Sequence, residues 1–313
     1  EYALRGTLRS LPYAPYRLWV GFTRLLAGAT FVVLRNYRRR MEENVTVALG
    51  NELPDPRDRA ALVWRAWLNF ALNVLETIAV MHWPKERILS TIALEGEEHI
   101  RRALEKGKGV LALSAHLGNF TLIGARLAAT GYPFSVVVKQ PPDERFARLV
   151  DALRLQIGVH TISAKPRREA VRGMLKALRE NRIVLIIADE FKSGDVMVDF
   201  FGLRGPAPRG PATIALRTGA VTLPMFATKR PDGSIVLSVR APIAPVVRED
   251  LEESVLATTA LYTRYLEDEI RRFPDQWNWF GLPRPGGKFS RAQLARRWKM
   301  AARENPAPQG PPR

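Results

Sequence analysis

Apolar and polar positions alternate along most of this chain in a way that predicts strands followed by helices. Continuous apolar runs, which are typical of buried strands, occupy 110–114, 134–138 and 183–187, and a shorter run occupies 159–162. Segments with helical spacing of their apolar residues lie beside these runs; they are 97–105, 120–129, 143–155 and 166–180. This alternation favours an α/β fold with a mainly parallel central sheet flanked by helices.

The chain beyond residue 220 has a different pattern. Two apolar runs, 221–227 and 235–239, are separated by a Pro-Asp-Gly turn, which predicts an antiparallel hairpin. A long helix is expected at about 252–272 because its apolar residues recur at helical spacing. The last residues, 301–313, are rich in proline, and we expect them to be a disordered tail.

An amphipathic segment near the start of the chain is the candidate for membrane contact. Residues 18–34 are largely apolar, and on one continuous helix Arg17, Arg24 and Arg35 would share a stripe. A charge at mid-membrane is costly, which argues against a simple span and favours a helix lying in the interface. The alternative is a helix that packs on the rest of the protein with its arginines in water. We favour membrane contact, with the basic cluster at 35–40 facing anionic lipid.

A further helix is expected between this segment and the sheet. Asp55 and Pro56 form a helix start, and apolar residues recur at helical spacing from there towards Pro84. The chain begins with Glu1 rather than Met, which leaves open a fragment or a processed chain that lacks an upstream anchor. The pattern divides the chain into a membrane-associated helical segment, an α/β domain and a disordered tail, at 1–40, 41–300 and 301–313.

Composition narrows the range of chemistry. The formal net charge of +17 over 313 residues implies an anionic partner, such as nucleic acid, anionic lipid headgroups or an acidic protein. A generic solvated basic surface is the alternative. The chain has no cysteine, which excludes disulfides, cysteine nucleophiles and cysteine-ligated zinc. With four scattered histidines, a histidine-rich metal site is not expected either.

The stretch 109–121 carries the candidate chemistry. The strand at 110–114 ends just before His116, and Gly118 and Asn119 precede the next helix. Open α/β sheets place their ligands at the carboxyl ends of strands, and a helix start nearby offers unpaired N–H groups. A lone histidine in such a loop is usually structural. The surrounding sequence, His-Leu-Gly-Asn-Phe, favours a functional histidine here.

Four short blocks resemble the bacterial lipid A biosynthesis acyltransferases, a branch of the lysophospholipid acyltransferase superfamily. The first begins at His116 and has Thr121 at the position of the family's acid. The second is VLIIADEFKSGDVMVDFFG at 184–202, the third is PRGPA at 208–212, and the fourth is PDQWNW at 274–279. Each block is short, but four blocks in the family's order are specific.

The resemblance implies a membrane-associated O-acyltransferase that moves a fatty acyl chain from acyl carrier protein or acyl-CoA onto a glycolipid hydroxyl. A lipid A precursor is the acceptor that the family suggests, and a phosphatidylinositol mannoside is the nearest alternative. The expected location is the cytoplasmic face of the bacterial inner membrane. Two other classes stay open: a lipid-binding relative without activity, suggested by Thr121, and a nucleic-acid binder, suggested by charge alone. We do not favour the nucleic-acid binder, because the sequence contains no motif for binding DNA or RNA.

The resemblance also implies roles for individual residues. His116 would act as the general base on the acceptor hydroxyl. Thr121 cannot be anionic, so we expect Asp189 or Glu190, which follow the strand at 183–187, to orient the imidazole. The competing interpretation is that both acids are surface residues of a turn.

Substrate contacts are expected from two kinds of group. Backbone N–H groups near Gly118 and Asn119 would stabilise the oxyanion. Lys139 and Arg209 flank motif blocks and are expected to bind phosphate groups. Neither a metal nor a cofactor is expected, since the acyl donor serves as a co-substrate.

Overall fold

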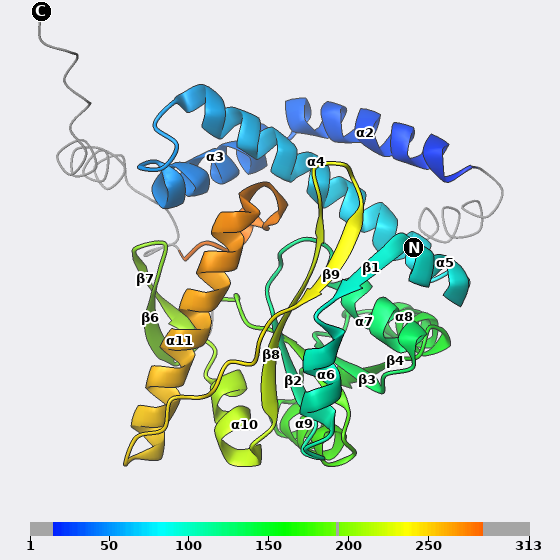
Figure 1. Ribbon diagram of the computed structural model, residues 1–313. Coiled ribbons are helices and arrows are strands. Elements are labelled where there is room, and N and C mark those ends of the chain that lie inside the picture. The colour runs from blue at the N-terminus through cyan, green and yellow to red at the C-terminus, as the bar shows by residue number, and fades with distance from the viewer. Residues whose placement is uncertain (1–14, 192–193, 284–313) are drawn as a thin grey trace, which may run out of the picture.

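The computed structural model describes residues 15–191 and 194–283, and a seven-stranded sheet lies at its centre (Figure 1). The strands of this sheet are β1 (Ile92–Glu95), β2 (Val110–Ser114), β3 (Phe134–Val138), β4 (Val159–Ser163), β5 (Ile183–Ile187), β8 (Val221–Lys229) and β9 (Ile235–Val239). They lie in the order β1-β9-β8-β2-β5-β3-β4, and every neighbouring pair is parallel except β8 and β9. The expected α/β class, the mainly parallel sheet and the antiparallel hairpin are confirmed.

Helices cover both faces of this sheet. They are α2 (Tyr16–Val33), α3 (Arg35–Leu49), α4 (Pro56–Val80), α5 (Lys85–Thr91), α6 (Glu97–Leu104), α7 (Thr121–Thr130), α8 (Glu144–Gln156), α9 (Arg167–Arg179), α10 (Gly210–Thr218) and α11 (Leu251–Arg272), with short 3-10 turns η2 (Pro274–Gln276) and η3 (Trp279–Gly281). Alternate residues of β2 enter two separate cores. Leu111 and Leu113 pack in the cluster that contains α9, α10 and α11, whereas Val110 and Ala112 pack in the cluster that contains α5, α6 and α7.

A second, two-stranded sheet was not expected from the sequence. It consists of β6 (Val196–Phe200) and β7 (Leu203–Ala207), which pair antiparallel beside α11 (Figure 1). In β6 buried and exposed side chains alternate, so the strand is buried on one face only. The expected tail at 301–313 and the end of the expected α/β domain at 284–300 lie outside the described residues.

The N-terminal helices form a bent pair rather than one helix. The axes of α2 and α3 meet at 87° at Leu34, so Arg35 begins a new helix and the expected single stripe of Arg17, Arg24 and Arg35 is wrong. The expected boundary at residue 40 falls inside α3. Among the described helices, none alone has the length and apolar content of a membrane span; only the bent pair together meets those two criteria.

Packing holds α2 against α4 along the upper edge of the molecule in Figure 1. Ala27 of α2 is buried, and Phe31 contacts Trp64 and Trp67 of α4 edge-on, with ring centroids 5.0 and 5.7 Å apart. Such edge-to-face pairs are favourable because the positive edge of one ring meets the negative face of the other. The N-terminal segment is thus packed on the helix that lies over the candidate site.

The start of α4 is capped as the sequence predicts. The Asp55 carboxylate accepts a hydrogen bond of 2.7 Å from the N–H of Arg57, and Pro56 occupies the first turn. This bond satisfies one of the N–H groups that have no partner within the helix.

We expect Asp55→Ala to lower the free energy of unfolding by about 1 kcal/mol, because the cap is lost. Asp55→Asn keeps an oxygen that can accept the same bond and is expected to remain close to the wild type. Urea unfolding followed by circular dichroism measures both variants. Equal stability of Asp55→Ala and the wild type would show that the cap contributes nothing.

Candidate active site

The register of two central strands brings the candidate catalytic residues together. Ser114 at the end of β2 pairs with Ile187 at the end of β5, and the N–H of Ala188 donates to the carbonyl of Ser114. Both strands are parallel, so two residues further along each chain His116 and Asp189 lie side by side. The carboxyl edge of the sheet, where ligands bind in open α/β folds, therefore carries an imidazole and a carboxylate.

Asp189 is buried and accepts hydrogen bonds from three donors. One oxygen, Oδ1, lies 2.8 Å from Nδ1 of His116. The other, Oδ2, accepts from the backbone N–H of His116 at 2.9 Å and from Nε1 of Trp277 at 2.8 Å. The side chain of Asp189 is only 1% exposed, whereas that of His116 is 39% exposed. The pair thus has a buried acid and a base that substrate can reach.

The surroundings of Asp189 favour its ionised form. Burial alone would raise the pKa of this carboxyl, but attraction to His116 and the hydrogen bonds from His116 and Trp277 outweigh burial and lower the pKa below its usual value. An ionised carboxylate only accepts, so the Nδ1 atom of His116 carries the proton. The lone pair that can take up a proton is then on Nε2.

The Gly118 and Asn119 amides are engaged within the protein. The N–H of Gly118 donates to the carbonyl of Gln276, and that of Asn119 donates to the carbonyl of Ala227, both at 2.9 Å. Both of these N–H groups therefore have a partner within the protein, and the oxyanion hole expected near Gly118 and Asn119 stays a prediction. Gly118 has φ of +59°, and a Cβ there would overlap the Ala227 carbonyl, which explains the need for glycine.

The remaining sequence candidates lie on separate elements of the fold. Glu190 is exposed on the turn after Asp189, and Lys139 is exposed at the end of β3, the strand next to β5. Arg209 precedes α10 and forms an ion pair with Glu252 of α11. Thr121 begins α7, where its N–H donates to the side chain of Asn119.

Trp277 contacts Asp189, although in the sequence it stood only as part of the fourth block, with no role of its own. Its ring is buried, and its centroid lies 4.9 Å from that of Trp279 and 6.0 Å from that of Phe201, which lies in the same sequence block as Asp189. The N–H of Asn278 also donates to the carbonyl of His116 at 3.0 Å. The second and fourth sequence blocks therefore meet in space, and the indole N–H reaches Asp189 because this aromatic packing fixes the ring.

The chain is similar to known proteins along most of its length. The sequence profile of a family described as bacterial lipid A biosynthesis acyltransferase matches residues 2–282. The chain belongs to this family. The lipid A biosynthesis lauroyltransferase of Escherichia coli K12 is 26% identical over 277 residues, which cover 86% of this chain and 85% of the relative. The phosphatidylinositol mannoside acyltransferase of Mycolicibacterium smegmatis is 25% identical over 260 residues, with 80% and 81% covered.

These relatives make the protein an acyltransferase enzyme. A third one, the lipid A biosynthesis palmitoleoyltransferase of Escherichia coli K12, is 21% identical over 225 residues, 71% of either chain. The resemblance inferred from the four sequence blocks is confirmed at the level of the family and of the reaction class. Within the described part of this acyltransferase, no group of three or more His, Asp or Glu side chains is placed to hold a metal ion.

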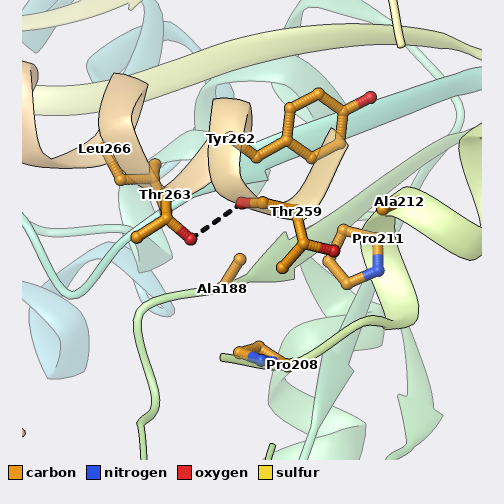
Figure 2. Close-up of a pocket in the computed structure, with 8 residues that line it drawn as sticks. All are labelled: Ala188, Pro208, Pro211, Ala212, Thr259, Tyr262, Thr263 and Leu266. Atoms are coloured by element: carbon orange, nitrogen blue, oxygen red, sulfur yellow. Dashed lines mark hydrogen bonds between the residues drawn. The ribbon is translucent and has the colours of Figure 1, made fainter. Parts of the chain in front are cut away.

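A small pocket of the acyltransferase lies next to the carboxyl edge of the sheet, between α10 and α11 (Figure 2). Ala188, the residue before Asp189, forms part of its wall. The hydroxyl of Thr263 donates a hydrogen bond of 2.9 Å to the carbonyl of Thr259 within α11. The wall is otherwise mostly apolar; it comprises Ala188, Pro208, Pro211, Ala212, Thr259, Tyr262, Thr263 and Leu266.

The lowered pKa of Asp189 predicts a dependence of stability on pH. Because the folded-state pKa lies below the unfolded value of about 3.9, ionised Asp189 stabilises the fold at neutral pH. That contribution is lost as the pH falls through about 4 towards the lower folded-state value. We expect Asp189→Asn to be less stable than the wild type at pH 7, with the gap narrowing below pH of about 4. Urea unfolding between these pH values measures the difference in the free energy of unfolding between the two proteins. A difference that does not change with pH would contradict the lowered pKa of Asp189.

Proposed function

We propose that this acyltransferase moves a fatty acyl chain from acyl carrier protein or acyl-CoA onto a hydroxyl of a glycolipid at a membrane surface. The observation that carries this proposal is the contact of 2.8 Å between Nδ1 of half-exposed His116 and Oδ1 of buried Asp189. This contact also favours an active enzyme over a lipid-binding relative without activity, because Asp189 supplies the anion that Thr121 cannot.

The geometry fits a direct transfer. The Nε2 atom of His116 takes the proton of the acceptor hydroxyl as its oxygen attacks the thioester carbonyl. The C–S bond then breaks, and the thiolate that leaves receives the proton from the imidazolium. Asp189 holds the ring orientation and stabilises the imidazolium, and Trp277 and the N–H of His116 hold Asp189 in place.

The acceptor and the donor are proposed by class. The relatives are named for lipid A and for phosphatidylinositol mannoside, which are both glycolipids, so a lipid A precursor is proposed first and the mannoside second. Exposed cations such as Lys139, which follows β3, and Arg168, at the start of α9, suit the phosphates of either kind of acceptor and of either donor.

Membrane association is proposed from an apolar surface on α2 and α4. The buried side of α2 faces α4, yet a stripe of large apolar side chains points outward, which is unusual for a helix in water. Basic residues Arg35, Arg39 and Arg40 are exposed at the start of α3, where they would meet anionic headgroups. The proposed location is the cytoplasmic face of the bacterial inner membrane. The outward stripe comprises Leu18, Phe22, Leu25, Leu26, Val32 and Val33, with Phe70 and Val74 of α4.

Substitutions at the pair test the catalytic assignment. We expect His116→Ala to abolish transfer and Asp189→Asn to lower kcat by about 10³- to 10⁴-fold, as in other histidine–acid pairs. Glu190→Gln is the matched control, because this neighbouring acid is exposed, and we expect it to change kcat by less than about threefold. Mass spectrometry of the acylated glycolipid, with acyl-CoA and acyl carrier protein supplied separately, measures the transfer. Normal turnover by His116→Ala would refute the mechanism.

Substitutions on the outer face of α2 test membrane binding. Phe22→Ser together with Leu25→Ser should lower the partition into anionic vesicles by roughly 100-fold, because each buried side chain contributes about 1.5 kcal/mol or more. Both side chains are exposed, so the fold should be unaffected. Met197→Ser with Val247→Ser is the control, since these residues are exposed elsewhere. Co-sedimentation with vesicles measures the partition; equal binding of the two double variants would rule out α2 as the contact.

A further inference from the structure

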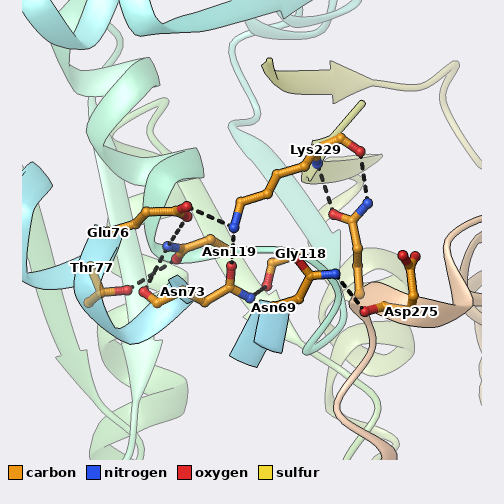
Figure 3. Close-up of polar contacts among 9 residues, drawn as sticks. Asn69, Asn73, Glu76, Thr77, Gly118, Asn119, Lys229 and Asp275 are labelled. Atoms are coloured by element: carbon orange, nitrogen blue, oxygen red, sulfur yellow. Dashed lines mark hydrogen bonds and ion pairs between the residues drawn. The ribbon is translucent and has the colours of Figure 1, made fainter. Parts of the chain in front are cut away.

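A buried polar cluster joins α4 to the loop that carries His116 (Figure 3). Its centre is an ion pair between Nζ of Lys229 and Oε1 of Glu76, which lie 2.7 Å apart with side chains only 18% and 7% exposed. Lysine and glutamate are rarely buried, and a buried pair adds little stability because both charges lose water. The presence of such a pair beside the candidate active site therefore calls for an explanation other than stability.

Glu76 also contacts the loop directly. Its other oxygen, Oε2, accepts a hydrogen bond of 3.3 Å from the side-chain amide of Asn119, and the same amide donates to the carbonyl of Asn73 at 3.1 Å. Thr77 donates to the amide oxygen of Asn119 at 3.2 Å. The Asn119 side chain is thereby fixed by groups from α4 at both of its polar atoms.

Lys229 is connected to the same loop through Asn73 and through Gln276. Its ammonium donates to the amide oxygen of Asn73, whose nitrogen in turn donates to the carbonyl of Gly118 at 2.8 Å. Its backbone N–H and carbonyl each form a bond of 2.8 Å with the side chain of Gln276, the residue before Trp277. The carbonyl of Gln276 then accepts from the N–H of Gly118. Lys229 is thus connected to both loops that meet at Asp189.

We propose that Lys229, through Glu76 and Asn73, is a positioning residue for the His116 loop and so for the His116–Asp189 pair. This proposal rests on the proposed function, because the pair is the one assigned to acyl transfer. Lys229 contacts Glu76, Asn73 and Gln276, which connect it to the loop that carries His116, so it acts through the loop. A shift of about 1 Å in a catalytic group can cost roughly 100-fold in rate, which makes such a support important for turnover.

The main test replaces the ammonium by an apolar chain of similar length. At a temperature where the proteins remain folded, we expect Lys229→Met to lower kcat roughly 10- to 100-fold while both KM values stay within about twofold. Lys229→Arg keeps a cation and should retain more activity than Lys229→Met. Arg230→Met is the matched control, since it removes the neighbouring cation, whose ion pair with Glu95 is exposed, and it should leave kcat unchanged.

A spectroscopic measurement separates this proposal from the proposed function. With ¹⁵N-labelled histidine only four residues contribute, and His116→Ala identifies the ring signal of His116. We expect the Nδ1–H proton to be protected from exchange in the wild type and in Arg230→Met, and to lose that protection in Lys229→Met. This measurement does not require turnover. A wild type without transferase activity would refute the proposed function, and the spectrum would still test whether Lys229 positions His116.

The outcomes are decisive in each direction. A folded Lys229→Met with wild-type kcat, with a change in KM alone, or with an unchanged His116 signal would overturn the positioning role. Should Lys229→Met fail to fold, the double variant Lys229→Met with Glu76→Gln removes both charges and leaves neither one buried without a partner. A folded double variant with reduced kcat and a less protected His116 proton would support the proposal, and one that matches the wild type would overturn it.

Discussion

A buried carboxylate that needs donors from two separate loops is the constraint on which this site depends. Asp189 is almost without solvent contact, and a charge in that position is tolerated only where hydrogen bonds replace the lost water. His116 supplies a ring N–H and a backbone N–H, and Trp277 supplies its indole N–H. The three bonds together fix the carboxylate, the tautomer of the imidazole and the position of the loop that carries Trp277.

The hydrophobic packing around the site supports these polar contacts. The ring of Trp277 is held between Phe200, Phe201 and Trp279, with centroid distances of 5.7, 6.0 and 4.9 Å. Asn44 of α3 donates to the carbonyl of Trp279, which connects the segment at 277–279 to the N-terminal helices. A large aromatic surface excludes water from the carboxylate and strengthens its electrostatic interaction with the imidazole.

Helix α4 presents different chemistry on different sides. Asn73 and Thr77, one turn apart, face the His116 loop and bond to Gly118 and Asn119. Phe70 and Val74 are exposed to solvent, and Trp67 packs on α2. Helix α4 therefore holds both α2, which is proposed to meet the membrane, and the loop that is proposed to carry out acyl transfer. This arrangement suits an enzyme whose acceptor is a lipid.

Local sequence determined the strands at 110–114, 134–138 and 183–187, the hairpin and the Asp55 cap, because a buried run, a turn or a cap depends on neighbouring residues. The motif His-Leu-Gly-Asn-Phe likewise indicated His116 and Gly118 as candidate site residues. The choice of acid was left to tertiary structure: Asp189 is 73 residues from His116 and reaches it only because β5 lies beside β2 in register. Asp189 is buried and Glu190 exposed because consecutive side chains of an extended chain point to opposite sides, a direction that only strand pairing sets. The break at Leu34, β6–β7, and the Lys229–Glu76 pair depend on long-range packing for the same reason.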